Sequence, residues 1–259
     1  MTGKYQSIIN KMPAAAALLI ILLLWLVLSE TGVVPAYMLP SPVDVLKAFA
    51  GDFTIILRHS AYTLTEAAAG LMMGVLLAFV MATLMDRFIV LDRACYPLMV
   101  ITQTIPTIAI APILVLWMGF GMAPKIALVV ITTFFPIAVG LLDGYRSVDR
   151  DSINLMRSMG AGRVRIFTHL KFPAALPHFF SGLKISASYA VVGALVSEWL
   201  GGFNGLGVYM TRVKKAYAFD KMFAVILFII IISLLLMLLV QCIRKASMPW
   251  EKALKEKHE

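Results

Sequence analysis

Six long apolar runs constrain the fold of this chain more than any other feature of its sequence. They lie near residues 13–30, 62–85, 94–118, 125–142, 177–200 and 221–242. A helix rises about 1.5 Å per residue and the hydrocarbon core of a bilayer is about 30 Å thick, so runs of this length can cross it, the short first run with help from its flanks. Unpaired backbone groups are costly in lipid, so the runs predict an all-α integral membrane protein with six transmembrane helices in one domain, 1–259.

The amino-acid composition agrees with a membrane protein. Hydrophobic residues make up 61% of the chain and charged residues only 14%, which is more apolar than a soluble domain requires. The net charge of +9 raises the question of nucleic-acid binding. The charges cluster at the ends of apolar runs without interleaved aromatic residues, so we expect no nucleic-acid partner.

Basic residues predict the orientation in the membrane. Lys4 and Lys11 precede the first run, and Arg244 and Lys245 follow the last. Because basic loops beside membrane spans normally mark the cytoplasmic side, both termini are expected in the cytoplasm. The same orientation places the long polar loop 143–176 in the cytoplasm. A further basic segment before the sixth run disagrees, since it would lie outside.

The third run contains three prolines, and polar residues surround the middle one, Pro106. Its neighbours Thr102, Gln103 and Thr104 are unusual in a lipid-facing helix. A proline removes a backbone donor and frees a carbonyl of the preceding turn, which is tolerated where that group faces protein or a water-filled path. Two interpretations stay open: a structural kink with threonine hydroxyls bonded to their own backbone, or the lining of a path.

The fifth run carries small residues at three- and four-residue spacing, among them Ser186, Gly193 and Ser197. A face of small residues favours close helix packing, with a path-facing role as the alternative. Glu198 would be costly in lipid, so it is a candidate for a cavity, although a place at the membrane interface would also suit it. The candidates for a translocation path are Thr102, Gln103, Thr104, Pro106, Ser186, Ser197 and Glu198.

The loop 143–176 reads as two short helices separated by a glycine. The first helix ends before Gly160, and the second has an apolar stripe, Val164, Phe167 and Leu170, beside basic residues. Pro173 ends it. A basic amphipathic helix of this kind lies on anionic lipid or inserts into a groove of a soluble partner, and the residues alone favour neither.

No pattern typical of an enzyme is present. The chain lacks the G-x-x-x-x-G-K-[ST] phosphate loop, and its four histidines are scattered without metal-ligand spacing. We therefore predict no catalytic, cofactor or metal site on this chain.

The loop resembles the cytoplasmic "EAA" loop of ATP-binding-cassette importer permeases. Asn154, Leu155 and Met156 stand where that family has Glu-Ala-Ala, Gly160 is its glycine, and Leu170, Phe172 and Pro173 fill its Ile-x-Leu-Pro ending. The stretches "QTIPTIAIAPILVLWMGFG" (103–121) and "SEWLGGFNGLG" (197–207) are similar to the branch that includes nitrate, taurine, alkanesulfonate and thiamine-precursor permeases.

This resemblance implies a permease subunit of a bacterial inner-membrane importer that forms the path of a small anion or heterocycle. Its implied partners are a second permease copy, two cytoplasmic ATP-binding subunits that carry ATP and Mg²⁺, an extracytoplasmic solute-binding protein and membrane lipid. A secondary transporter driven by an ion gradient is the alternative, but few mid-membrane acids and no inverted repeat are visible. The implied ATPase-coupling residues are Asn154, Leu155, Met156, Gly160, Val164, Phe167, Leu170 and Pro173.

Overall fold

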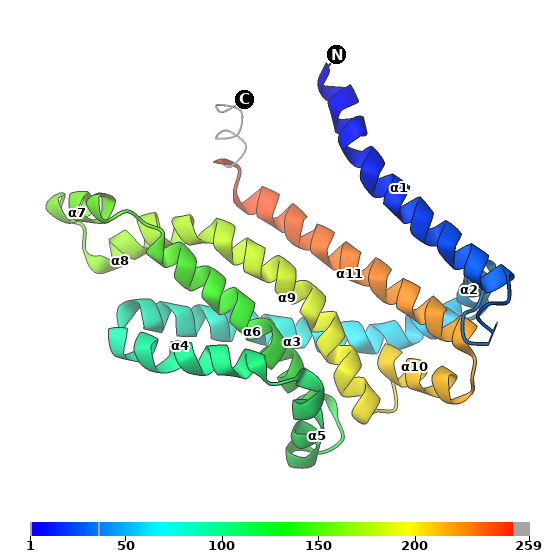
Figure 1. Ribbon diagram of the computed structural model, residues 1–259. Coiled ribbons are helices and arrows are strands. Elements are labelled where there is room, and N and C mark those ends of the chain that lie inside the picture. The colour runs from blue at the N-terminus through cyan, green and yellow to red at the C-terminus, as the bar shows by residue number, and fades with distance from the viewer. Residues whose placement is uncertain (1, 36, 251–259) are drawn as a thin grey trace. The chain divides into compact units, whose positions relative to one another are not determined.

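The computed structural model describes residues 2–35 and 37–250, and every regular element in these ranges is a helix (Figure 1). The described residues form two compact units. The smaller unit consists of the described part of 1–57 together with 209–228. The larger unit consists of 58–208 together with the described part of 229–259. In chain order the helices are α1 (Thr2–Glu30), α2 (Pro42–Gly51), α3 (Phe53–Arg87), α4 (Ile89–Thr104), α5 (Thr107–Met118), α6 (Met122–Arg146), α7 (Arg150–Ser158), α8 (Arg163–Ile166), the π-helical turn η1 (Phe167–Lys171), α9 (Phe172–Leu200), α10 (Leu206–Lys215) and α11 (Phe219–Ser247).

The predicted six spans correspond to long apolar helices in the described residues. Five helices are long and apolar enough to cross a membrane alone: Met12–Glu30, α3, α6, the continuous segment Arg163–Leu200, and α11. The pair α4 and α5 forms a sixth candidate span, bent by 102°. The all-α membrane fold is therefore confirmed, with five candidate spans, or six when the bent pair is counted as one.

The third span differs from the expected single helix over 94–118 because it breaks at Pro106. Proline disfavours the helical conformation of the residue before it, and Ile105 is extended, with φ −82° and ψ 122°. The chain then turns sharply into α5, with Pro106 just before its first residue. Pro97 and Pro112 lie inside α4 and α5, where the helices continue through them.

The larger unit is organised around close packing of α6 against α9, which run alongside each other in Figure 1. A Cβ atom at Gly140 would lie 2.7 Å from the carbonyl oxygen of His178, and one at Gly182 would overlap the carbonyl oxygen of Pro136. The hydroxyl of Ser186 donates to the carbonyl of Thr133 at 2.8 Å. The small residues of the fifth span therefore bring two helix backbones together, as close-packed membrane helices require.

The main apolar core of this unit lies between α3, α4, α6 and α9. It includes the fully buried side chains of Leu142 and Tyr145 and the buried methyl group of Ala175. Gly70 and Gly74 of α3 lie against Val129 and Thr133 of α6, so the GxxxG pair of the second span is a helix contact. These contacts hold together the helices that carry the site.

The smaller unit is held by aromatic contacts and a short capped helix. Ser41 precedes α2 and accepts a hydrogen bond from the Asp44 amide at 3.2 Å, with Pro42 at the first helical position. The indole of Trp25 donates to the carbonyl of Pro40 at 3.1 Å, and its ring centroid lies 5.9 Å from that of Phe223. These contacts anchor the end of α1 to the start of α11.

Candidate functional site

The loop between α6 and α9 folds into short helices joined by a glycine turn. α7 ends at Ser158, and Gly160 follows with φ of +81°, a left-handed conformation that glycine adopts without strain. The amide of Ala161 donates to the carbonyl of Met156, which satisfies one of the free carbonyls at the helix end. The helix–glycine–helix arrangement expected within 143–176 is present.

The residues that the sequence predicts to contact an ATPase divide into an exposed set and a partly buried set. Leu155 and Val164 are 62% and 78% exposed. Met159, which the sequence prediction did not include, is 77% exposed beside them. The exposed set is Asn154, Leu155, Gly160 and Val164, and the partly buried set is Met156, Phe167, Leu170 and Pro173.

Phe167 faces the protein rather than solvent. Its ring centroid lies 5.3 Å from that of Tyr145 in α6 and 6.4 Å from that of Phe172 in α9. It packs against the main apolar core. Aromatic pairs in this distance range add to the stabilisation from burial. Phe167 therefore fastens the loop to the helix bundle.

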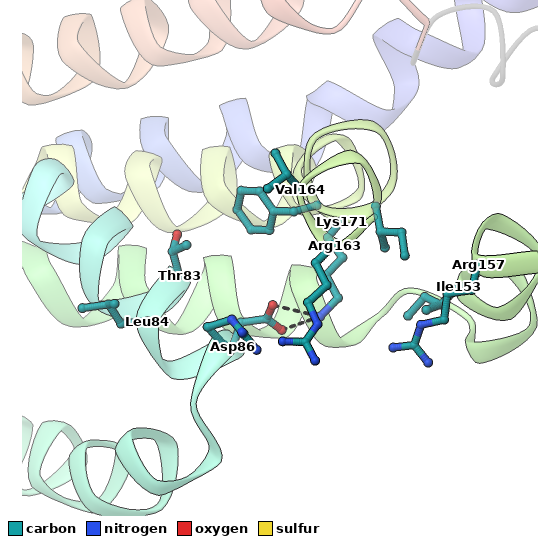
Figure 2. Close-up of a pocket in the computed structure, with 11 residues that line it drawn as sticks. Thr83, Leu84, Asp86, Ile153, Arg157, Arg163, Val164 and Lys171 are labelled. Atoms are coloured by element: carbon teal, nitrogen blue, oxygen red, sulfur yellow. Dashed lines mark hydrogen bonds and ion pairs between the residues drawn. The ribbon is translucent and has the colours of Figure 1, made fainter. Parts of the chain in front are cut away.

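The π-helical turn η1 connects α8 to α9 without interrupting the helical path. Such turns insert an extra residue into a helix and are frequent at functional sites. At its end, the ammonium group of Lys171 donates to both carboxylate oxygens of Asp86 in α3, at 2.6 and 2.8 Å (Figure 2). This ion pair joins the loop to α3, just as Phe167 joins it to α6.

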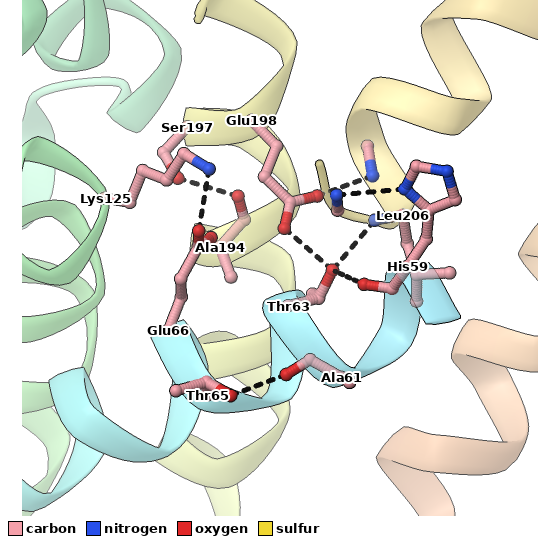
Figure 3. A network of polar contacts seen from close by, with 12 residues as sticks. His59, Ala61, Thr63, Thr65, Glu66, Lys125, Ala194, Ser197, Glu198 and Leu206 are labelled. Atoms are coloured by element: carbon pink, nitrogen blue, oxygen red, sulfur yellow. Dashed lines mark hydrogen bonds and ion pairs between the residues drawn. The ribbon is translucent and has the colours of Figure 1, made fainter. Parts of the chain in front are cut away.

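A buried polar network occupies the opposite end of α9. Glu198, 2% exposed, accepts hydrogen bonds from the hydroxyl of Thr63 at 2.7 Å and from the amide of Gly207 at 2.6 Å. The amide of Leu206 donates to the Thr63 oxygen at 2.8 Å, and the amide of Gly205 donates to Nδ1 of His59 at 3.1 Å. Figure 3 shows these side chains converging on the turn before α10.

The glycines of this turn allow it to lie directly on Glu198. Gly205 has φ of +121°, and a Cβ atom there would overlap the Glu198 carboxylate. A Cβ atom at Gly207 would lie 2.6 Å from the carbonyl oxygen of Leu195. At position 205, the positive φ and the lack of room for a Cβ atom both require glycine. The network and the turn therefore depend on each other. We refer to Glu198, Thr63, His59 and the 205–207 turn as the clasp.

A buried ion pair lies near the clasp. Nζ of Lys125 is 2.7 Å from Oε1 of Glu66, and their side chains are only 7% and 3% exposed. Oε2 of Glu66 has no hydrogen-bond partner among the described residues. A Cβ atom at Gly202 would lie 3.0 Å from Nζ of Lys125, so the segment just before the turn lies against this pair. Removing two charges from water is costly, and the pair is stable only because each charge compensates the other.

The sequence prediction included Glu198 but missed the other polar residues around it, in the clasp and in the ion pair. Glu66 is an acid inside the apolar run 62–85, and Lys125 is a base at the edge of the run 125–142. Ionisable residues inside spans face the protein interior and pair with one another, so this signal was available. Thr63 and His59 carried no comparable signal, because their role depends on a turn far away in the sequence.

The residues predicted to line a path fall in two different environments. Thr102, Gln103, Thr104 and Pro106 are exposed at the break between α4 and α5. The hydroxyls of Thr102 and Thr104 donate to the carbonyls of Met99 and Ile101 of their own helix. The buried set is Ser186, Ser197 and Glu198, of which Ser197 donates to the carbonyl of Ala194 at 2.7 Å.

The smaller unit holds a second polar cluster, centred on Asp52. Its carboxylate accepts hydrogen bonds from the hydroxyl of Tyr209 and, at 2.8 Å, from the ammonium group of Lys221. Burial raises the pKa of Asp52, but the two hydrogen bonds and the charge of Lys221 outweigh it and leave the pKa below its ordinary value. Burial, and then the neighbouring Asp52 carboxylate, raise the pKa of Tyr209. The cluster therefore joins α2 to α10 and α11 around a carboxylate that stays ionised.

Comparisons of this sequence with protein families and with individual proteins agree on one family. The family described as "Binding-protein-dependent transport system inner membrane component" matches residues 70–250. A probable ABC transporter permease protein of Haemophilus influenzae is 36% identical over 217 residues, which cover 84% of this chain and 89% of that protein. The formylaminopyrimidine transport permease protein ThiX of Halalkalibacterium halodurans is 36% identical over 217 residues, covering 83% of this chain and 87% of that protein.

A solved structure supports the same fold. The crystal structure of an amino acid ABC transporter with histidines superimposes with a TM-score of 0.63 and covers 76% of this chain and 96% of that one. The sequences are 14% identical, so the likeness concerns the fold alone.

Proposed function

Since the chain belongs to the family of binding-protein-dependent transport system inner membrane components, we propose that two permease copies form one path for a small solute across the membrane. The chain is a permease subunit of an ATP-binding-cassette importer. Two separate ATPase subunits bind ATP and Mg²⁺, and an extracytoplasmic solute-binding protein delivers the solute. The basic residues that flank the first and last spans support cytoplasmic termini.

The observation that carries the coupling proposal is an exposed apolar face on the loop between α6 and α9. Leu155, Met159 and Val164 are 62%, 77% and 78% exposed. We call these three residues the docking face. Short amphipathic helices bind soluble partners by inserting such side chains into a groove. The ATPase subunit is the partner that this class of permease requires, so the docking face is its contact site.

The loop is connected rigidly enough to transmit the movement of an ATPase. The segment Arg163–Leu200 is one continuous helical path of 38 residues, roughly 57 Å at 1.5 Å per residue. Lys171 ties its loop end to α3 through Asp86, and Phe167 ties it to α6 through Tyr145. Displacement of the docking face therefore moves α9 as a body. The other end of α9 carries Glu198, so the clasp receives that movement.

The solute that fits these observations best is a small uncharged heterocycle. The side chains exposed at the break in the third span, Thr102, Gln103 and Thr104, are neutral and form hydrogen bonds. A formylaminopyrimidine permease is among the relatives at 36% identity. A nitrate- or sulfonate-like anion is the alternative solute, and it would need donors from the second permease copy.

Replacement of Leu155 by Asp tests the docking face. Leu155 is exposed and lies outside the apolar core, so the variant should fold and insert normally. An aspartate in an apolar groove loses the burial of a leucine and leaves a charge unpaired, which should weaken ATPase binding by roughly tenfold or more. The measurement is recovery of ATPase subunit with the tagged permease from detergent extracts, together with ATP-driven solute uptake.

Leu46→Asp is the matched control, because Leu46 is 57% exposed on the short helix α2 and does not belong to the loop. It should leave ATPase recovery unchanged. Recovery of the ATPase at the same level with Leu155→Asp would refute the docking face. Uptake that needs only an ion gradient, without any ATPase, would refute the importer assignment as a whole.

A further inference from the structure

A cavity of about 520 Å³ lies between the end of α3, α7 and the α8–η1 segment. Its charged lining consists of one acid, Asp86, and four bases, Arg87, Arg157, Arg163 and Lys171. Figure 2 shows Arg163 and Lys171 beside Asp86, with Arg157 on α7 across the cavity. The cavity is therefore a basic site built from three separate elements.

Two of the four bases lack an acceptor. Both oxygens of Asp86 are bound by Lys171, so this acid cannot neutralise the arginines. Arg157 and Arg163 have no ion pair or side-chain hydrogen bond in the part of the chain that the structure describes, and both are exposed. Arg87 contacts only the face of Phe88, at 5.4 Å, in that same part. The cavity thus presents guanidinium groups that can still take an anion.

Phosphate is an anion that matches this arrangement. The planar guanidinium group binds phosphate oxygens through paired N–H donors, and several arginines around one phosphate strengthen the contact. A carboxylate is the other common acceptor, but it carries only two oxygens for donors that approach from α7 and from α8. The separation of the two arginines on different elements therefore favours the larger, tetrahedral anion.

The surroundings indicate that this phosphate belongs to a lipid. Arg87 is the last residue of α3, a membrane-spanning helix, so the cavity lies where lipid headgroups lie. The next residues, Phe88, Ile89 and Val90, are 49%, 66% and 74% exposed. An apolar surface directly beside a basic cavity suits a molecule with an anionic head and an acyl chain. A soluble phosphate compound would make no use of that surface.

We propose that this cavity binds the phosphate of an anionic phospholipid headgroup, held by Arg157 and Arg163, with the acyl chains along the exposed segment 88–90. The lipid would contact α3, α7 and α8 together and so stabilise the loop in the position described. Val164 of the docking face also lines this cavity, so the lipid would lie beside the proposed ATPase contact, while the solute path is not part of the site.

The test is lipid binding to the purified full-length chain in detergent, measured by native mass spectrometry with phosphatidylglycerol and, separately, with phosphatidylcholine of the same acyl chains. The double variant Arg157→Gln/Arg163→Gln should weaken phosphatidylglycerol binding by about 25-fold, since each base near a membrane surface contributes about fivefold. Phosphatidylcholine should bind weakly to both forms. The matched control is Arg150→Gln/Arg165→Gln, which removes two arginines from the same helices outside the cavity and should bind phosphatidylglycerol like the unaltered chain.

Three results would overturn the proposal. Equal losses in the two double variants would mean a general attraction of basic residues for anionic lipid. Displacement of phosphatidylglycerol by millimolar inorganic phosphate would assign the cavity to a soluble anion. Unchanged phosphatidylglycerol binding in the cavity variant, combined with loss of ATPase recovery, would assign it to an acidic segment of the ATPase. Because lipid binding is measured on the permease alone, failure of the ATPase proposal leaves this test unaffected.

Discussion

At the scale of single residues, the carboxylate of Glu198 organises a backbone turn. Its two oxygens accept from Thr63 and from the amide of Gly207, and the chain passes so close that Gly205 can carry no side chain. A buried carboxylate with two donors keeps its place only while both donors remain. The clasp is therefore sensitive to any movement of α9 relative to α3.

The buried pair of Lys125 and Glu66 gives a prediction at this scale. Lys125→Met leaves the Glu66 carboxylate buried without a counter-charge, and loss of one partner of such a pair costs on the order of 3 kcal/mol. The apparent melting temperature in detergent should fall accordingly, by about 2–4 °C per kcal/mol.

The double variant Lys125→Met/Glu66→Leu removes both charges and should recover most of this loss, because replacement of a buried ion pair by apolar groups is often neutral. If the double variant melts as low as Lys125→Met alone, the pair is not what stabilises the bundle. If the single variant melts like the unaltered chain, the pair contributes nothing measurable.

Individual side-chain directions were the hardest feature to predict from the sequence. Val164 and Phe167 lie three residues apart, a spacing that predicts one shared helical face. The structure leaves Val164 78% exposed and packs Phe167 against Tyr145, and the π-helical turn over Phe167–Lys171 then shifts the register of the residues that follow. A local departure from the 3.6-residue period leaves no mark in hydrophobic spacing, so the sequence could not reveal it.

At the scale of elements, periodicity and length predicted the spans well because a bilayer allows little else. All six runs correspond to long helices or to the bent pair α4 and α5. The three prolines of the third run predicted a kink or break in that helix, but their spacing did not indicate at which proline it would occur. The break occurs at Pro106, where Ile105 is extended, whereas the helices continue through Pro97 and Pro112.

The contact between α6 and α9 gives a prediction at the scale of elements. Gly182→Ala should push the two helices apart, because the added methyl group would overlap the carbonyl oxygen of Pro136, a backbone atom that cannot turn aside. Overpacking of this kind costs about 1–3 kcal/mol, which outweighs the gain of up to about 1 kcal/mol from alanine in a helix. The apparent melting temperature should fall.

Gly51→Ala is the matched control, since Gly51 ends α2 and a methyl group there meets nothing within 4 Å. It should leave the melting temperature equal or slightly raised. A melting temperature for Gly182→Ala that is equal to or above that of the control would show that α6 and α9 are not in close contact.

At the scale of the whole molecule, the sequence predicted the class of protein, whereas the contacts with its proposed partners stay predictions. The loop and the motifs of the third and fifth spans lie within residues 70–250, which the family matches, and this match confirms that class. In the proposed importer, the solute would be selected by a few side chains in a path between two permease copies. One sequence gives the candidates for that path but not how two copies place them.

Gln103 provides the prediction for the assembled importer. Its side chain is exposed at the break between α4 and α5, and it makes no hydrogen bond within residues 12–35 and 37–250. An exposed side-chain amide without a hydrogen bond can bind a polar solute. Loss of one neutral hydrogen bond to the solute should lower the uptake rate by about 3- to 10-fold. Gln103→Leu should therefore reduce ATP-driven uptake of labelled formylaminopyrimidine while ATPase recovery stays unchanged.

Thr104→Val is the control for this change, because the hydroxyl of Thr104 is already bonded to the carbonyl of Ile101 in its own helix. Its replacement alters the same short segment without removing a free donor, so uptake should stay near that of the unaltered chain. Equal uptake by both variants would place the path away from the break. If labelled taurine is transported and formylaminopyrimidine is not, the solute is an anion, and the donors that bind it come from elsewhere in the pair of permeases.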